Sequence, residues 1–211
     1  MADILQEIAT NLYNGNAKAT GELVQKALDQ GLSAGEVLTG GLVAGMDEVG
    51  KGFKSGELFV PEVLIAARAM HAGMAVLKPL LADSDVPSAG KFAVGTVKGD
   101  LHDIGKNLVK MMVEGGGFEV VDLGVDVSPD AFVKAVREHK PNVIGMSALL
   151  TTTMTSMKDV IEALQEAGLR KSVKIMIGGA PVTEAYAKEI GADGYAPDAA
   201  TAVDVARSLV G

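Results

Sequence analysis

The sequence predicts an α/β fold in two parts: a helical bundle over residues 1–88, followed by a doubly wound parallel sheet over residues 89–211. Two observations predict it. Apolar residues recur at helical spacing through roughly the first 80 residues, and short apolar runs then alternate with helical stretches. Between the two patterns, the polar segment 81–90 contains proline and glycine, which is typical of a linker between domains. We therefore expect the boundary there.

The first part reads as a four-helix bundle. Apolar residues such as Ile4, Ile8 and Leu12 recur every three to five positions. Pro61 suits the first turn of a helix. Short amphipathic helices bury their apolar stripes best against each other, in an antiparallel bundle. The predicted helices span residues 2–13, 16–29, 33–51 and 60–81.

The second part contains five strand–helix units. The predicted strands are 92–97, 118–123, 143–147, 173–177 and 193–195, and the predicted helices are 104–115, 129–139, 153–168, 181–190 and 198–209. Such alternation favours a parallel sheet covered on both faces, which is a flavodoxin-like arrangement. With strand order 2-1-3-4-5, a ligand crevice lies beyond the carboxyl ends of strands 1 and 3, where the order reverses.

Composition narrows the function classes. The chain has 211 residues, 48% of them hydrophobic, which is ample for a packed core. A net charge of −8 with no basic cluster argues against nucleic-acid binding. We saw neither an apolar run of about 18 residues nor a signal peptide, so we expect no membrane contact and a cytoplasmic location. The absence of cysteine excludes disulfides and thiolate ligands, and leaves three histidines as nitrogen donors.

The segment Gly99-Asp100-Leu101-His102-Asp103-Ile104-Gly105 carries the clearest chemical pattern. His102 can coordinate a metal, and Asp100 can accept the other ring N–H and fix the tautomer. Gly105 leaves room for a bulky group near the backbone. Taken alone, His102 also fits a structural histidine. We expect His71 and His139 to be structural.

Two later loops fall at the same predicted edge of the sheet. Ser147 closes the third strand and leads into hydroxyl-bearing residues, while Gly178 and Gly179 follow the fourth. Backbone N–H groups and hydroxyls there suit a sizeable ligand that forms hydrogen bonds, and the glycines leave space for a flat group. A simple strand-to-helix turn is the alternative reading of the glycine pair.

These residues resemble the cobalamin-binding domains of methionine synthase and of corrinoid methyltransferase systems. Asp100-Leu101-His102-Asp103-Ile104-Gly105 is similar to the family's Asp-x-His-x-x-Gly motif, and Ser147-Ala148-Leu149 and Gly178-Gly179 are similar to its two later motifs. In the first part, 46–53 and 56–61 resemble the helical cap over the corrin ring. The resemblance covers nearly the whole chain.

The resemblance implies a role for each matching residue. His102 would replace the benzimidazole of the cofactor as lower axial ligand of cobalt, with Asp100 and Thr153 tuning it. The residues implied to contact the cofactor or its displaced nucleotide tail are Gly99, Leu101, Asp103, Ile104, Gly105, Ser147, Leu149, Thr151, Gly178, Gly179, Tyr195, Ala196, Asp198 and Ala199. Met46, Phe53, Phe59 and Val60 would cover the upper face; Phe53 and Phe59 also fit an ordinary bundle core.

The family chemistry implies a cobalamin or related corrinoid that cycles between cob(I)alamin and methylcob(III)alamin. Ligation of cobalt by His102 must then strengthen and relax, and we expect proton uptake on reduction because Asp100 holds a proton-sharing pair. The expected function is a non-catalytic corrinoid carrier. It would take a methyl group from a substrate-specific methyltransferase and pass it to a second one that uses tetrahydrofolate or coenzyme M. A reductive activase is a third expected partner.

Three alternatives stay open. A cobalamin-dependent regulator shares both parts, but it normally adds a basic DNA-binding motif that this acidic chain lacks. The small subunit of an adenosylcobalamin mutase shares the histidine motif without needing a helical lid. A flavodoxin-like domain without cobalt leaves the three linked motifs unexplained.

Overall fold

The structure is a computed structural model that describes residues 2–81 and 88–211. Its described residues form two compact units. One runs to Ser88 and includes Gly115–Gly117, and the other comprises Ala89–Glu114 and Phe118–Gly211. Most of the predicted linker 81–90, namely residues 82–87, lies outside the described residues.

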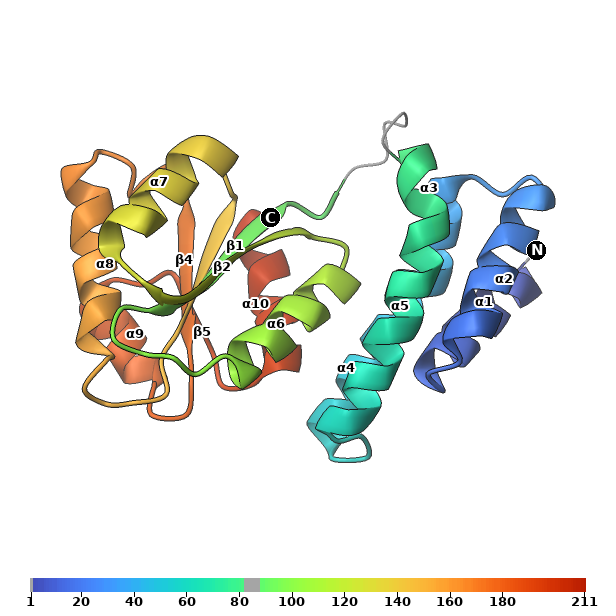
Figure 1. Ribbon diagram of the computed structural model, residues 1–211, viewed down its shortest axis with the longest axis horizontal. Helices are drawn as coiled ribbons and strands as arrows, with labels where there is room; N and C mark the ends of the chain where they lie inside the picture. Colours follow the sequence, from blue (N-terminus) through green and yellow to red (C-terminus); the bar gives the residue numbers. More distant parts are fainter. Residues whose placement is uncertain (1, 82–87) are drawn as a thin grey trace. The chain divides into compact units, whose positions relative to one another are not determined.

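The first unit is helical (Figure 1). Its elements are α1 (Ala2–Tyr13), α2 (Ala17–Asp29), α3 (Ala34–Val37), the π-helical segment η1 (Leu38–Val43), α4 (Ala44–Ser55) and α5 (Val60–Leu81). Where one helix was expected over 33–51, the structure has α3, η1 and α4 in succession. Ser33 begins this stretch with a capping box, since its Oγ accepts from Glu36 N–H and a Glu36 carboxylate oxygen accepts from Ser33 N–H. Gly56, left-handed at φ 78°, ends it.

Close helix contacts explain two glycines of this unit. A Cβ on Gly45 would lie 3.0 Å from the carbonyl oxygen of Ala9, and one on Gly41 would lie 3.0 Å from Cγ2 of Ile8. The glycines therefore let η1 and α4 pack closely against α1.

Helix α5 corrects one sequence expectation. By length and composition alone it is apolar enough to cross a membrane, although we had seen no such run; 39% of its apolar window is buried. Its buried residues, among them Val63, Met70 and Leu77, pack inside the bundle. A core helix of a soluble protein passes the same test, so this property is weak evidence for a membrane span.

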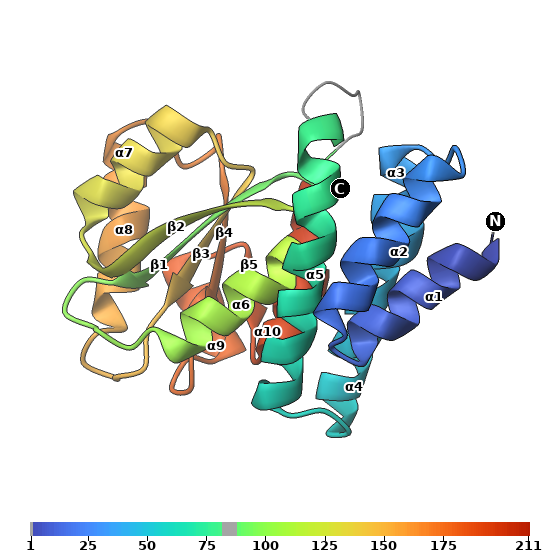
Figure 2. The ribbon, with the colours of Figure 1, turned by 45° about the vertical axis from the view of Figure 1, so that its right-hand side comes forward.

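The second unit holds a five-stranded sheet in the order β2-β1-β3-β4-β5 with every neighbouring pair parallel, which confirms the predicted topology. Its strands are β1 (Lys91–Val97), β2 (Glu119–Val127), β3 (Val143–Ser147), β4 (Lys174–Gly178) and β5 (Gly194–Ala196). Its helices are α6 (Ile104–Gly115), α7 (Pro129–His139), α8 (Thr155–Glu166), α9 (Glu184–Ile190) and α10 (Ala199–Val210). Helices α7, α8 and α9 cover one face and α6 and α10 the other (Figures 1 and 2).

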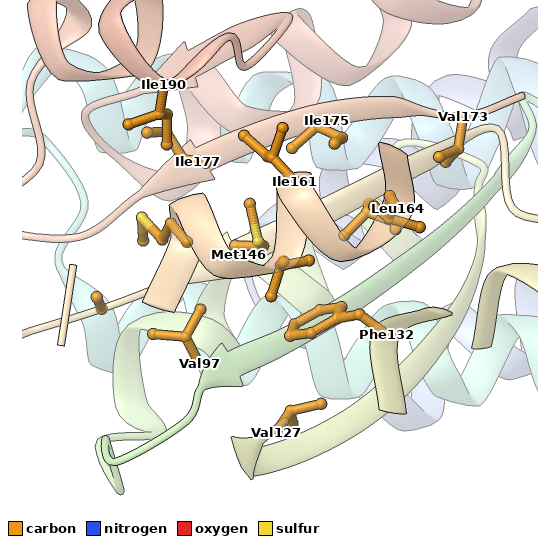
Figure 3. Packing of buried hydrophobic residues seen from close by; sticks show 14 of the residues in the cluster. Val97, Val127, Phe132, Met146, Ile161, Leu164, Val173, Ile175, Ile177 and Ile190 are labelled. Carbon is orange, nitrogen blue, oxygen red and sulfur yellow. The ribbon is translucent and has the colours of Figure 1, made fainter. Parts of the chain in front are cut away.

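One hydrophobic core lies between the sheet and the helices α7, α8 and α9 (Figure 3). Phe132 of α7 and Ile161 of α8 are fully or almost fully buried against strand residues such as Ile175. Strand β3 is buried from Val143 to Met146, as expected of a central strand covered on both faces. This packing fixes the carboxyl ends of β1 and β3.

Strand β2 is longer and less regular than predicted. It continues to Val127 rather than ending at 123, and the register with β1 shifts where Val94 pairs with Asp122 but Gly95 pairs with Gly124. Gly124 has a φ of 85°. The irregularity lies toward the carboxyl end of the strand, at the same edge of the sheet as the loop that carries His102.

Candidate functional site

His102 lies at the reversal point of the strand order, where β1 and β3 end side by side. Thr96 pairs with Ser147 across these two strands. The buried Thr96 hydroxyl also donates to the main-chain carbonyl of His102 at 2.8 Å, which ties the loop after β1 to its own strand. Ligands of such sheets bind beyond this edge.

Asp100 is the centre of the hydrogen-bond network in this loop. Its side chain is fully buried. One carboxylate oxygen, Oδ2, accepts from the Thr153 hydroxyl at 2.7 Å, from Leu149 N–H at 2.8 Å and from Leu150 N–H at 3.3 Å. The other, Oδ1, lies 2.7 Å from Nδ1 of His102 and accepts from the His102 main-chain N–H at 3.1 Å. The carboxylate of Asp100 thus joins the loops after β1 and β3 through hydrogen bonds.

This network keeps Asp100 ionised. Burial acts to raise its pKa, but the hydrogen bonds from the Thr153 hydroxyl, Leu149 N–H and His102 outweigh burial and hold the pKa far below its ordinary value. An ionised carboxylate can only accept, so Nδ1 of His102 carries the proton. Nε2 is then left as the lone-pair nitrogen, and the ring is half exposed, at 50%.

An apolar surface surrounds this half-exposed ring. Exposed large apolar side chains come from the loops after β1 and β3 and from the end of β2: Leu101, Ile104, Val125, Leu149 and Leu150. Leu101 is 72% and Ile104 77% exposed, and several exposed apolar side chains gathered in one region are typical of a binding surface. A single imidazole next to apolar side chains suits a large, flat molecule that has an apolar face and carries its own metal.

The glycines of the predicted tail channel differ in role. A Cβ on Gly105 would meet nothing within 4 Å, so this position borders open space. A Cβ on Gly179 would lie 1.9 Å from the carbonyl oxygen of Ala148, and one on Gly178 would lie 2.8 Å from that of Ala196. Close approach of the chain to itself therefore requires Gly178 and Gly179, as in the alternative reading of this pair. Their contact with a cofactor stays a prediction.

Other predicted residues have visible roles within the chain. Asp198 caps α10 by accepting from Thr201 N–H at 2.7 Å, and Asp103 accepts from the Asn107 side chain at 3.1 Å. Gly99 precedes Asp100 in the His102 loop, Ser147 ends β3, Thr151 is exposed after it, Tyr195 and Ala196 lie in β5, and Ala199 is buried at the start of α10.

The predicted upper-face residues all belong to the helical unit. Met46 is buried, at 2% exposure, Phe53 is partly buried and Phe59 is 65% exposed. Val60 is the first residue of α5. Their role over a cofactor stays a prediction.

Two residues near the site were missed from the sequence. Asp126, at the end of β2, accepts from Gly99 N–H and donates its own N–H to the Asp100 carbonyl. Tyr186 of α9 donates its hydroxyl to the Met154 carbonyl at 2.7 Å, next to Thr153. Gly124 and Asp126 inside an apolar run were the available signal, because glycine and aspartate are depleted in regular strands.

The donor set fits a metal that brings most of its own ligands. Within residues 2–81 and 88–211, no group of three or more histidine or carboxylate side chains could hold a metal ion. His102 offers one nitrogen, with its tautomer fixed by Asp100, inside an apolar surface. A corrinoid, whose macrocycle already holds cobalt, matches this arrangement.

Comparison with known proteins supports the match to a corrinoid. Residues 90–204 match a family model described as "B12 binding domain", and residues 4–78 match a second with the same description. Dimethylamine corrinoid protein 1 of Methanosarcina acetivorans is 46% identical over 209 residues, which are 99% of this chain and 98% of the relative.

Two solved structures resemble the chain over almost its whole length. A cobalamin-binding protein from Desulfitobacterium hafniense is 36% identical with a TM-score of 0.82, over 98% of both chains. The methanol:cobalamin methyltransferase complex MtaBC from Methanosarcina barkeri contributes a chain that is 30% identical with a TM-score of 0.87, over 99% of this chain and 80% of that one.

Fold and site together define a cobalamin-binding protein, whose cofactor is cobalamin or a related corrinoid. More narrowly, the chain belongs to the corrinoid proteins of methyltransferase systems.

Proposed function

We propose that this chain carries a methyl group between two methyltransferases, with His102 as the lower axial ligand of its corrinoid. The hydrogen bond between Asp100 and Nδ1 of His102 is the observation that carries the proposal, because it leaves Nε2 as the free lone pair. The corrinoid supplies a cobalt centre that accepts and releases a methyl group.

The protein side chains set the position and protonation of the ligand. Asp100 orients the imidazole and holds a proton at Nδ1, while Thr153 and Leu149 N–H stabilise the carboxylate that does so. Thr153 is itself buried, and its hydroxyl also lies 2.9 Å from the Leu150 carbonyl. We therefore assign proton exchange with solvent to the half-exposed His102 ring.

For partners, we propose a methyltransferase specific for a small methylated substrate as donor, a second methyltransferase using tetrahydrofolate or coenzyme M as acceptor, and a reductive activase. Methylated amines are the first donors to test, since the dimethylamine corrinoid protein is 46% identical and the chain of the methanol complex 30%. Purified methyltransferases for methylamines and for methanol can be supplied in turn, each with its substrate, after the cobalt of the reconstituted protein has been reduced to cobalt(I) by an added chemical reductant. We expect one of them to methylate the protein much faster than the others.

The ligand assignment is tested by reconstitution with hydroxocobalamin. After desalting, wild type should retain stoichiometric cobalt. Reduced to cobalt(II) in uniformly ¹⁵N-labelled protein, it should show an electron paramagnetic resonance doublet from a protein nitrogen rather than the triplet of the unlabelled benzimidazole.

His102→Ala should lose the doublet, while His139→Ala, in the same unit at the end of α7, should keep it. A triplet in wild type would overturn the assignment of His102 as the ligand. Failure of the folded wild type to retain cobalt after desalting would contradict the expected stoichiometric binding of hydroxocobalamin.

A further inference from the structure

Asp126 has an unusual backbone conformation at the end of β2. Its φ is 53°, and among the described non-glycine residues only Lys140 shares a positive φ. Aspartate tolerates the left-handed region better than most residues, but the conformation still costs free energy and persists only where other contacts enforce it.

Two hydrogen bonds hold Asp126 to the loop that carries His102. Its Oδ1 accepts from Gly99 N–H at 2.7 Å, and its main-chain N–H donates to the Asp100 carbonyl at 3.0 Å. Both reach the main chain of Gly99 and Asp100, which precede Leu101 and His102 in the same loop. The left-handed turn thus directs both an N–H and a carboxylate of one residue toward this loop.

Asp100 is consequently held from both neighbours of β1. The loop after β3 holds its side chain through Leu149 and Thr153, and Asp126 of β2 holds its main chain. The His102 ring is positioned by a 2.7 Å bond to that same carboxylate. If the main chain at Gly99 and Asp100 shifted, the carboxylate could not stay on both Thr153 and His102.

We propose that Asp126 is a positioning residue for cobalt ligation: it fixes the main chain of Asp100, so that the imidazole of His102 stays aimed at the metal. This inference rests on the proposed ligand role of His102. The role needs the acceptor oxygen and not the charge of Asp126, because the partner is a neutral main-chain N–H.

The test compares Asp126→Gly with Asp126→Asn. Glycine adopts a positive φ freely, so it removes the acceptor without adding strain, whereas asparagine keeps both the acceptor and a tolerated φ. Asp130→Asn, an exposed residue in the first turn of α7, is the matched control. Circular dichroism and thermal unfolding check that each variant folds.

Three measurements are made on each variant: exchange of the Gly99 amide in the cofactor-free protein, the dissociation constant for hydroxocobalamin, and the ¹⁵N doublet of the cobalt(II) form. Asp126→Gly should speed the amide exchange, weaken binding by up to about tenfold, which is the upper end of what one ordinary hydrogen bond contributes, and lose part of the doublet. Asp126→Asn should stay within about twofold of wild type in binding.

Faster Gly99 exchange with unchanged binding and an unchanged doublet would overturn the proposal, because Asp126 would then stabilise the loop without affecting cobalt ligation. Equal losses in Asp126→Asn and Asp126→Gly would also overturn it, because the charge would then matter rather than the acceptor. Failure of the His102 assignment is recognised separately, by a triplet in wild type.

Discussion

Asp100 and Asp122 are two carboxylates of the same unit whose partners differ in kind. Asp122 of β2 accepts from the ammonium groups of Lys106 at 2.7 Å and Lys110 at 3.3 Å, and from Gly124 N–H. Asp100 accepts from neutral N–H and O–H groups and from the imidazole of His102. Both carboxylates have lowered pKa values, in each case because hydrogen bonds outweigh burial.

The difference separates a carboxylate whose charge is balanced by a neighbouring lysine from one that accepts from the proposed cobalt ligand. The charge of Asp122 is balanced inside the protein by Lys106, whose side chain is 3% exposed, so the pair joins α6 to the irregular part of β2. The charge of Asp100 has no fixed cation among these partners. It is therefore available to the Nδ1–H of His102, as the proposed ligand role of this ring requires.

Asp100→Ala should have the largest effect. It removes the carboxylate that accepts from the Leu149 N–H, the Thr153 hydroxyl and the His102 ring, so we expect a loss of about 3 kcal/mol in the free energy of unfolding. Urea denaturation measures this change. A loss no larger than that of Lys106→Met would contradict the central place given to Asp100.

Lys106→Met should cost about 2 kcal/mol, because Asp122 keeps Lys110 and Gly124 N–H as partners. Hydroxocobalamin retention at saturating concentration should stay at the wild-type level. Urea denaturation and cobalt analysis after desalting test both parts. Lost retention in the folded variant would break the contrast between the two carboxylates.

Thr153→Val removes one hydroxyl donor to Asp100 while keeping the shape, and should cost about 1.5 kcal/mol in urea denaturation. It should also raise the pKa of Asp100 toward its ordinary value, because that donor stabilises the ionised form. The carboxyl ¹³C chemical shift followed against pH reports the change. Thr153→Ser, which keeps the donor, should restore both properties.

The smallest predicted effect is the dependence of stability on pH. Because the pKa of Asp100 lies below 3.8 in the folded state, its stabilisation is complete above that value and is lost as pH falls toward the folded pKa. Between pH 6 and pH 3, Asp100 should account for about 1 kcal/mol of lost unfolding free energy. Urea denaturation of wild type and Asp100→Asn at both pH values isolates this share, which should be missing from the variant.

Local patterns predicted most of the fold. The predicted helices 2–13 and 60–81 have the observed bounds, and the alternation of strands and helices predicted the five-stranded parallel sheet, whose order is the flavodoxin-like one that we assumed. The π-helical segment η1 was missed because a shift in main-chain hydrogen bonding barely changes apolar spacing. The end of β2 was missed because Gly124 and Asp126 interrupt its apolar run.

The site was predictable to the extent that it is local in sequence. Asp100 and His102 are two residues apart, so their pairing is visible in the chain itself. Thr153 lies 53 residues from Asp100 and was identified only by resemblance. Asp126 acts on main-chain atoms of another loop, so the sequence marks its position with an interrupted apolar run but does not indicate its partner.

The irregular end of β2 has a further consequence, for self-association. β2 is an edge strand of nine residues, and a regular edge of this length would offer its free N–H and C=O groups to another strand. Two features of β2 oppose such pairing. The irregular backbone at Gly124 and Asp126 misaligns these groups, and the exposed Glu119 adds a negative charge at the other end of the strand. Asp126, which holds the His102 loop, thereby also helps to discourage the sheet from extending into aggregates.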